Sequence, residues 1–189
     1  MIRVLTVFIL FLLFTACSSN QKAGVVYHDR FNFSEVKSYS LYERNSIFSE
    51  AQNLLDTRRN AIEIAIERTM ASKKFSYAAI DAADVIITYH VFNGKHGDFS
   101  KYNQVVHFCA HCLRATTWQT DNQYSKVSHG SIVLDIVDPK QSRSVWRSIY
   151  PLNIKDKDNS AETNDKIKHA VAIMLAQYPQ VPTNYKPIN

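Results

Sequence analysis

The sequence predicts an α+β domain in which two long helices pack on one face of a mostly antiparallel sheet of about four or five strands. Two segments repeat apolar residues at the spacing of an amphipathic helix. Several shorter segments are rich in β-branched and aromatic residues and are bounded by turn residues. Along the chain they follow the order strand, helix, strand, long loop, strand, strand, helix, which favours helices gathered against a single sheet.

The length and composition are those of an ordinary globular domain. The chain has 189 residues, of which 46% are hydrophobic and 21% are charged. It is therefore long enough to bury a core of its own and is unlike a disordered tail. The formal net charge is +5, but no run of Lys and Arg with interleaved aromatic residues occurs. The sequence thus gives no support to nucleic-acid binding.

The N-terminus has the layout of a secretory signal peptide. Arg3 precedes an apolar run at residues 4–14, which is shorter than the ~20 residues that a membrane-spanning helix needs. The stretch LFTAC that follows resembles the lipobox of bacterial lipoproteins, although Phe14 stands where Leu is usual. We therefore expect residues 1–16 to be a lipoprotein signal peptide and Cys17 to carry the anchoring lipid.

The residue after the cysteine bears on localisation. Ser18, not Asp, follows Cys17, which resembles the pattern for transfer to the outer membrane in bacteria with two membranes. We expect a lipid-anchored protein of the bacterial cell envelope, at the outer membrane and facing the periplasm. The expected partners are the membrane, through the lipid, and other envelope proteins or a cell-wall polymer, but no nucleic acid.

A short polar tether is expected at residues 17–26, the single domain at 27–180 and a C-terminal tail at 181–189. Within the domain, alternation and β-forming residues predict four strands, at residues 36–43, 84–91, 131–138 and 144–150. The last two flank a hairpin turn that starts at Asp138. Residues 92–127 are expected to form a long loop with an extra strand at 104–108.

Two helices are predicted, at residues 49–74 and 159–179. Apolar residues recur along one face of each, and Pro179 ends the second because proline cannot continue a helix. Each helix begins with residues that can form a capping box, Ser49 with Gln52 and Asn159 with Glu162.

The stretch VVHFCAHCLR contains the most distinctive residues of the mature chain. If Cys17 carries lipid, the remaining cysteines are Cys109 and Cys112, and thiols outside the cytoplasm tend to be oxidised. We expect a Cys109–Cys112 disulfide that stiffens the long loop. Zinc is the alternative, with Cys109, Cys112, His107 and His111 as ligand types.

The zinc alternative needs further ligands, because four ligands within six residues would strain the backbone. His90, His96 or His129 could supply a remote pair. A redox role would need a thiolate at a helix N-terminus in a βαβ setting, which the predicted order lacks. Haem attachment is disfavoured because Leu113, not His, follows the second cysteine.

No catalytic constellation is recognised, so no catalytic residue and no cofactor are expected. The chain has no phosphate-binding Gly-rich loop, no Gly-x-Ser-x-Gly elbow and no His-Glu-x-x-His helix. Asp135 interrupts an apolar strand and is expected to pair with Arg147 on the next strand, while Asp138 belongs to the turn. His90 is expected to be packed and hydrogen-bonded in the core.

Five motifs in order resemble a known family of bacterial envelope lipoproteins, domain of unknown function 4136. They are YHDRFNFSEVKSYSLYE, DTRRNAIEIAIERTMASKKFSY, AADVIITYHV, GSIVLDIVDPKQSRSVWRS and IKHAVAIMLAQYPQ. The resemblance implies a compact α+β lipoprotein domain and no enzyme activity. The CAHC loop departs from the family pattern, so a function of that loop is not implied by the resemblance.

We therefore expect a membrane-anchored envelope lipoprotein with a non-enzymatic binding or scaffolding role. The alternative is a metal-binding or thiol-redox envelope protein that uses the Cys109–Cys112 loop.

Overall fold

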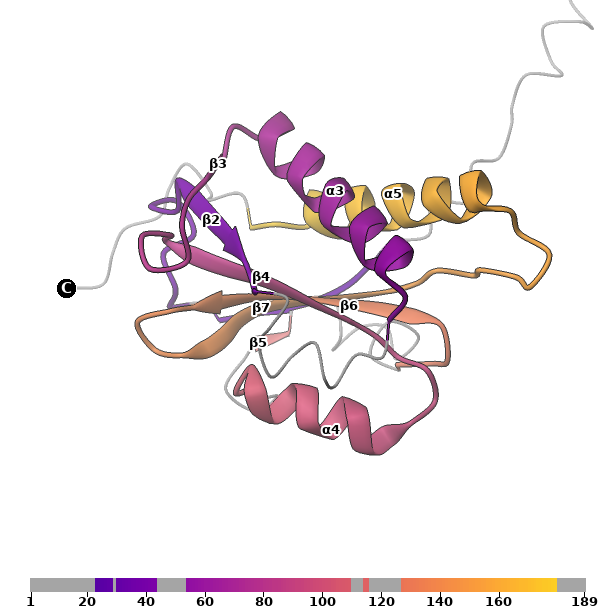
Figure 1. Ribbon diagram of the computed structural model, residues 1–189. Helices are drawn as coiled ribbons and strands as arrows, with labels where there is room; N and C mark the ends of the chain where they lie inside the picture. Colours follow the sequence, from indigo (N-terminus) through magenta and orange to yellow (C-terminus); the bar gives the residue numbers. More distant parts are fainter. Residues whose placement is uncertain (1–22, 29, 44–53, 110–113, 116–126, 180–189) are drawn as a thin grey trace, which may run out of the picture.

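The computed structural model describes residues 23–28, 30–43, 54–109, 114–115 and 127–179. In these residues a single sheet lies between two helices on one face and one helix on the other (Figure 1). The elements in chain order are β1 Gly24–Tyr27, β2 Ser38–Leu41, α3 Asp56–Ser72, β3 Ser76–Tyr77, β4 Val85–Val91, α4 His96–Val105, β5 Arg114–Ala115, β6 Ser131–Asp138, β7 Arg143–Pro151 and α5 Ser160–Ala176.

The sheet is mixed, with strand order β3-β2-β4-β6-β7-β1-β5. Strands β4, β6 and β7 form an antiparallel centre, and β1 joins β7 antiparallel. Strand β2, however, runs parallel to both β3 and β4. The expectation of a mostly antiparallel sheet of about four or five strands is therefore wrong in this detail, since seven strands are described. Parallel neighbours need a crossover connection, and α3 supplies it between β2 and β4.

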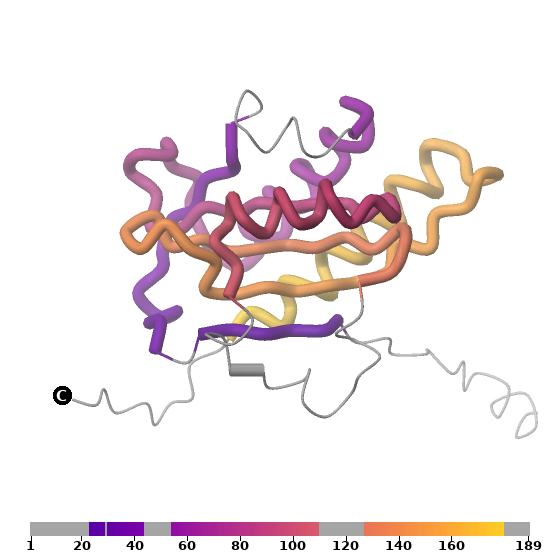
Figure 2. The backbone as a smooth tube through the Cα atoms, turned by 90° about the horizontal axis from the view of Figure 1, so that it is seen from below, coloured from indigo at the N-terminus to yellow at the C-terminus, as the bar shows by residue number. Residues whose placement is uncertain are grey.

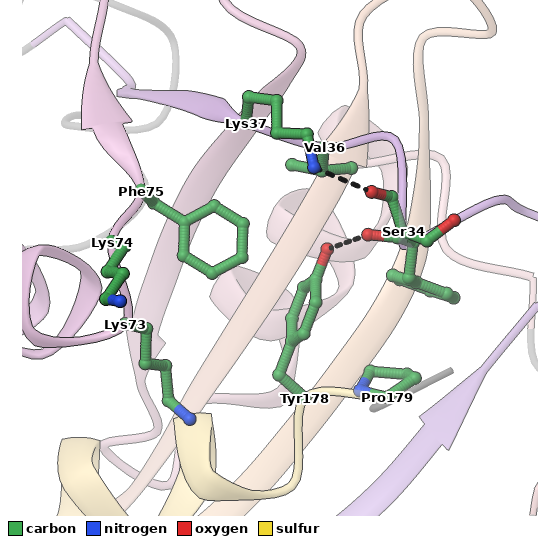
Figure 3. A pocket seen from close by; sticks show the side chains of 9 residues that line it. Ser34, Val36, Lys37, Lys73, Lys74, Phe75, Tyr178 and Pro179 are labelled. Atoms are coloured by element: carbon green, nitrogen blue, oxygen red, sulfur yellow. Dashed lines mark hydrogen bonds between the residues drawn. The ribbon is translucent and has the colours of Figure 1, made fainter. Parts of the chain in front are cut away.

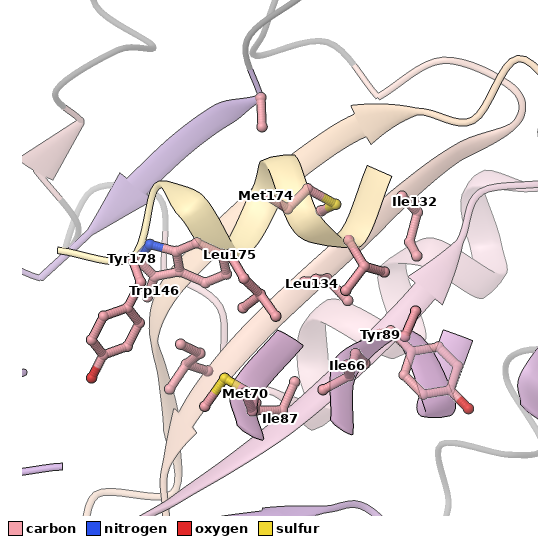
Figure 4. Packing of buried hydrophobic residues seen from close by; sticks show 14 of the residues in the cluster. Ile66, Met70, Ile87, Tyr89, Ile132, Leu134, Trp146, Met174, Leu175 and Tyr178 are labelled. Carbon is pink, nitrogen blue, oxygen red and sulfur yellow. The ribbon is translucent and has the colours of Figure 1, made fainter. Parts of the chain in front are cut away.

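The main core lies between the sheet and the helices α3 and α5 (Figure 4). The two helices predicted from the sequence do pack on this face, and most of their expected apolar residues are buried there. Strand residues Leu134 and Ile136 meet them from β6, and Trp146 meets them from β7. Each such side chain contributes about 1.5–3 kcal/mol when it is fully buried.

The opposite face of the sheet carries a third helix, which the sequence analysis missed. Residues 92–127 were expected to be a loop with a strand at 104–108, but His96–Val105 is helix α4. Phe99, Tyr102 and Val106 recur at the three- and four-residue spacing of a helix and pack against the sheet. In Figure 2 this helix lies in front of the strands and α5 lies behind them.

Because both faces are covered, every residue of β4 and β6 is buried. This explains why neither strand alternates between apolar and polar residues.

The helix starts differ from expectation in one case. Helix α3 begins at Asp56 after Leu55, which provides no side-chain cap, so the predicted continuous helix 49–74 is wrong over residues 54–55. The predicted Ser49–Gln52 capping box lies outside the described residues. Leu54 instead packs on the core as part of the connection. In α5 the capping box is confirmed: the Glu162 amide donates to the Asn159 side chain at 2.9 Å, and the Asn159 amide donates back to Glu162 at 3.0 Å.

The folded domain also begins earlier than expected. Residues 24–26 were assigned to the tether 17–26, but they form most of β1 and pair with β7. Val25 and Val26 are buried there, which a solvated tether would not allow. Residues 1–22, with the expected signal peptide and Cys17, and the tail from residue 180 onward lie outside the described residues. No described helix has the length and apolarity needed to cross a membrane.

Candidate functional site

A charged pair lies in the core beneath α4. The carboxylate of Asp135 on β6 accepts from Arg147 Nε at 2.9 Å and from Arg147 Nη2 at 2.9 Å. The two residues face each other across the β6–β7 ladder and are almost completely shielded from solvent, with exposed side-chain fractions of 0% and 1%. The pairing expected from the sequence is confirmed.

Other side chains complete this buried network. Tyr102 of α4 donates its hydroxyl to Asp135 at 2.7 Å, and Ser144 donates to the other carboxylate oxygen. Arg147 Nη1 donates to Asn103 at 2.8 Å. The ring of Phe108 covers the guanidinium, with its centroid 3.4 Å from Arg147 Cζ. Burial, and next the Asp135 carboxylate, raises the pKa of the Tyr102 hydroxyl well above its usual value. The charged groups of this network are thus hydrogen-bonded to other side chains of the protein.

His90 of β4 lies beside this network. Its ring stacks on Tyr102 at a centroid distance of 4.9 Å and is completely buried. Neither ring nitrogen has a hydrogen-bond partner in the described part of the chain. The expectation of a packed residue is confirmed, but that of a hydrogen-bonded one is not. Burial lowers the pKa of His90 to about 4, and the positive charge of Arg147 adds to that shift.

The structure places only part of the cysteine loop. His107 is exposed, and its Nδ1 lies within hydrogen-bond distance of the Ser142 carbonyl oxygen. Cys109 is half-buried and disulfide-bonded. Cys112 and His111 lie outside the described residues, so the Cys109–Cys112 pairing and the zinc alternative both stay predictions. Within the described ranges, no three His, Cys, Asp or Glu side chains are grouped to hold a metal.

The histidines considered as remote zinc ligands are also placed. His90 is enclosed in the core, whereas His96 and His129 are exposed. Phe108, between His107 and Cys109, is the residue that covers Arg147. Cys109 therefore directly follows Phe108, the residue that covers the buried network.

A concave site that the sequence analysis missed lies where α3 and α5 both end (Figure 3). We call it the lysine pocket; its volume is about 470 Å³ and its lining residues are Phe33, Ser34, Val36, Lys37, Lys73, Lys74, Phe75, Tyr178 and Pro179. Lys73 and Lys74 lie on one side and Ser34 on the other, with the rings of Phe75 and Tyr178 between them. Those two ring centroids are 5.4 Å apart in an edge-to-face arrangement.

Local backbone geometry builds one side of the lysine pocket. Helix α3 ends in a Schellman motif, in which the Lys74 amide donates to Ala71 at 2.9 Å and the Phe75 amide donates to Met70 at 3.1 Å. Lys74 occupies the left-handed position of the motif, with φ of 68°. This turn directs the chain from α3 into the segment that carries Phe75.

The opposite side of the lysine pocket comes from distant parts of the sequence. The Tyr178 hydroxyl, just after α5, donates to the Phe33 carbonyl at 3.0 Å. Burial is the main cause that raises the pKa of Tyr178, so the hydroxyl keeps its proton. In the sequence, Lys73 and Lys74 stand out only as positive residues at the end of a predicted helix, where positive charge is favourable. No local signal joins them to residues 33–37 and 178–179.

Fold and site together define a small α+β protein with the buried Arg147–Asp135 pair beneath α4 and a concave surface lined by lysine and aromatic side chains. The chain belongs to the family described as Domain of unknown function (DUF4136), whose model matches residues 24–180. This confirms the resemblance drawn from the sequence motifs.

One solved structure of the same family agrees on the fold. A crystal structure of a DUF4136 family protein from Bacteroides thetaiotaomicron is 17% identical, with a TM-score of 0.53, covering 84% of this chain and 96% of that one. A crystal structure of a PDZ domain protein from Parabacteroides distasonis is 13% identical with a TM-score of 0.47, covering 87% of this chain and 38% of that one. No protein with a curated description matches the chain.

Proposed function

We propose that this protein is a lipid-anchored component of the bacterial envelope that works by binding and not by catalysis. The observation that carries the proposal is the N-terminal sequence, in which a short apolar run ends in LFTAC at Cys17. A lipid on Cys17 would hold the domain at the outer membrane, facing the periplasm. Its partners there would be the membrane itself and other envelope proteins or a cell-wall polymer.

The arrangement of charged groups supports binding over catalysis. Asp135, Tyr102 and Arg147 would be the natural acid–base candidates, but they are buried and bonded to one another. A general acid or base must come within hydrogen-bond reach of a substrate, and α4 and Phe108 cover these groups. The lysine pocket, in contrast, opens to solvent along Ser34, Lys37 and Lys74.

Replacing the lipidation residue tests the proposal. The full chain is expressed in a bacterium with two membranes, as the wild type and as Cys17→Ser, and is labelled with a clickable palmitate analogue. We expect label on the wild type in the outer-membrane fraction and none on Cys17→Ser. Cys109→Ser is the matched control and should keep the label. A labelled Cys17→Ser chain, or an unlabelled wild type, would refute the lipid anchor.

The disulfide at Cys109 favours a structural clip over the metal alternative. A native mass spectrum of the full chain, purified in detergent without chelator, separates these two. A clip predicts a mass lower by the hydrogens lost on oxidation and no bound metal. A stoichiometric metal that is absent from Cys109→Ser and Cys112→Ser would instead support the alternative.

A further inference from the structure

The lysine pocket carries an excess of positive charge that its own lining does not balance. Three of its lining residues are lysines and none is acidic. Lys37 donates its ammonium to the neutral Ser34 carbonyl at 3.2 Å, which leaves its charge uncompensated. No described acidic side chain forms an ion pair with Lys73 or Lys74.

Two carboxylates next to the lining residues already accept hydrogen bonds. Asp84 accepts from the Lys37 and Ser38 amides at 2.9 and 2.8 Å, and these bonds are the main reason that its pKa is lowered. Glu35 accepts from the Asn32 side chain at 2.7 Å. Neither carboxylate lines the pocket, so an incoming anion would meet ammonium groups first.

The backbone keeps one of these lysines at an unfavourable position. Lys74 has φ of 68°, a conformation that glycine adopts without steric cost and that other residues adopt only at a cost. Residues held in such conformations cluster at ligand sites, where the side chain is needed. A lysine in place of the usual glycine therefore points to a use for its ammonium.

Size and wall chemistry define the kind of anion. The volume of about 470 Å³ falls within the roughly 300–1,000 Å³ of small-molecule pockets and exceeds what a bare inorganic anion needs. The Phe75 and Tyr178 rings form an apolar wall that suits the organic part of a ligand. The Tyr178 hydroxyl is already bonded to Phe33, so the free hydrogen-bond donors are ammonium groups.

We propose that the lysine pocket binds the phosphate group of a larger organic anion. Lys73 and Lys74 would contact the phosphate, because lysine is a common phosphate ligand that acts as a point charge. Phe75 and Tyr178 would pack against the attached organic group. The phosphate could belong to a soluble phosphate ester or to a phospholipid headgroup. The inference rests on the proposed binding role but not on the lipid at Cys17.

Calorimetric titration of the full chain in non-ionic detergent tests the site. The probes are glycerol 3-phosphate, mixed micelles that contain phosphatidylglycerol, and glycerol as the phosphate-free control. We expect saturable binding of a phosphate probe and none of glycerol. The double variant Lys73→Gln/Lys74→Gln should bind about tenfold more weakly or worse, because two charge-assisted contacts are lost.

The matched control is Lys95→Gln/Lys101→Gln, which removes the same charge from exposed residues beside and on α4. Its affinity should stay at the wild-type value. Binding of glycerol 3-phosphate alone would identify a soluble ester, and binding of the micelles alone would identify a headgroup; either supports the site. Binding of neither probe, or equal loss in both double variants, would overturn it. That failure would leave palmitate labelling of Cys17 unaffected, so it is distinguishable from failure of the proposed anchor.

Discussion

At the scale of single residues, the buried Arg147–Asp135 pair is stable only if its surroundings meet several conditions. Removing two charges from water costs several kcal/mol for each ion, and the pair offsets that cost only if every remaining donor and acceptor is bonded. Here Tyr102, Ser144 and Asn103 complete the bonding. Because Asp135 and Arg147 stand opposite each other on β6 and β7, a shift in strand register would separate the charges. We infer that the pair specifies register more than it adds stability.

Removal of one partner should therefore be costly. Asp135→Asn leaves the buried guanidinium without its counter-ion, so we expect the free energy of unfolding to fall by about 3 kcal/mol or more. Urea unfolding of the full chain measures this. Asp156→Asn, at an exposed carboxylate, should change stability by about 0.5 kcal/mol or less. An Asp135→Asn variant as stable as this control would contradict the inferred role of the pair.

His90 should make the fold sensitive to acid. Its pKa is about 4 in the folded protein and about 6.5 in an unfolded chain, so the unfolded state binds the proton more readily between these values. The stability contributed by neutral His90 is complete above pH 6.5 and is lost as pH falls toward 4. Burial is the main cause of the lowered pKa and Arg147 adds to it, while Asp98 and Asp135 oppose it.

The size of this effect can be measured with an aromatic replacement. Between pH 7.5 and pH 5 we expect the wild type to lose about 2 kcal/mol through His90. His90→Phe keeps the stacking on Tyr102 but cannot titrate, so its stability should fall by correspondingly less on acidification.

At neutral pH the His90→Phe variant should be at least as stable as the wild type, because two unpartnered buried nitrogens are removed. His129→Gln, at an exposed site, should follow the wild type; identical pH profiles for His90→Phe and the wild type would exclude this role.

At the scale of elements, the ends of the helices differ in what determines them: some depend on residues close in sequence, and others depend on packing or backbone geometry. The start of α5 depends on Asn159 and Glu162, which are close in sequence, and it was predicted correctly. The start of α3 depends on packing: Leu54 contacts the core, and no side chain caps the helix. The end of α3 depends on the left-handed backbone conformation of Lys74. Glycine usually marks such a position in a sequence, and lysine does not.

Lys74→Gly should stabilise the end of α3. Glycine at the left-handed position of a Schellman motif avoids the steric cost that Lys74 bears, so we expect a gain of about 0.5–1 kcal/mol in the free energy of unfolding. Thermal and urea unfolding of the full chain measure it. If the lysine pocket binds phosphate, the same variant should bind glycerol 3-phosphate more weakly. Lys73→Gly, in the preceding non-left-handed position, should not stabilise, and a stabilising effect there would contradict the explanation.

The distinction between local and non-local determinants explains which parts of the structure could be predicted from the sequence. Residues 131–138 were predicted as a strand with the bounds that β6 has, because an apolar run between turn residues is a local signal. Helix α4 was missed although Phe99, Tyr102 and Val106 have helical spacing, since the polar residues between them obscured the pattern. The parallel pairing of β2 with β4, and the lysine pocket, need contacts such as Phe33 with Tyr178 across 145 residues. Such contacts leave no trace in a local pattern.

At the scale of the whole molecule, the sheet separates two unequal layers. The layer of α3 and α5 is apolar and continuous, and α5 alone buries Ile167, Ala170, Val171, Met174 and Leu175. The layer of α4 is smaller, and within this helix Tyr102 is the buried residue. Much of what α4 covers is the polar network, so the free energy that holds it in place comes from fewer apolar groups.

We therefore expect α4 to open separately from the rest of the domain. Segments with few buried apolar contacts exchange their amide hydrogens through local opening, at a lower free energy than global unfolding. Hydrogen exchange followed by mass spectrometry on the full chain should show faster exchange in His96–Val105 than in Ser160–Ala176.

The disulfide at Cys109 should also affect the local opening of α4. It lies next to Phe108, which covers Arg147, so reduction should loosen the end of the α4 layer. With a reductant present, we expect faster exchange in α4 and unchanged exchange in α5, whose core is on the other face of the sheet. Equal protection of the two helices would show that the sheet couples its faces into one cooperative unit. Acceleration of both helices on reduction would show that the cysteine loop stabilises the whole domain and not only the layer that closes the buried charges.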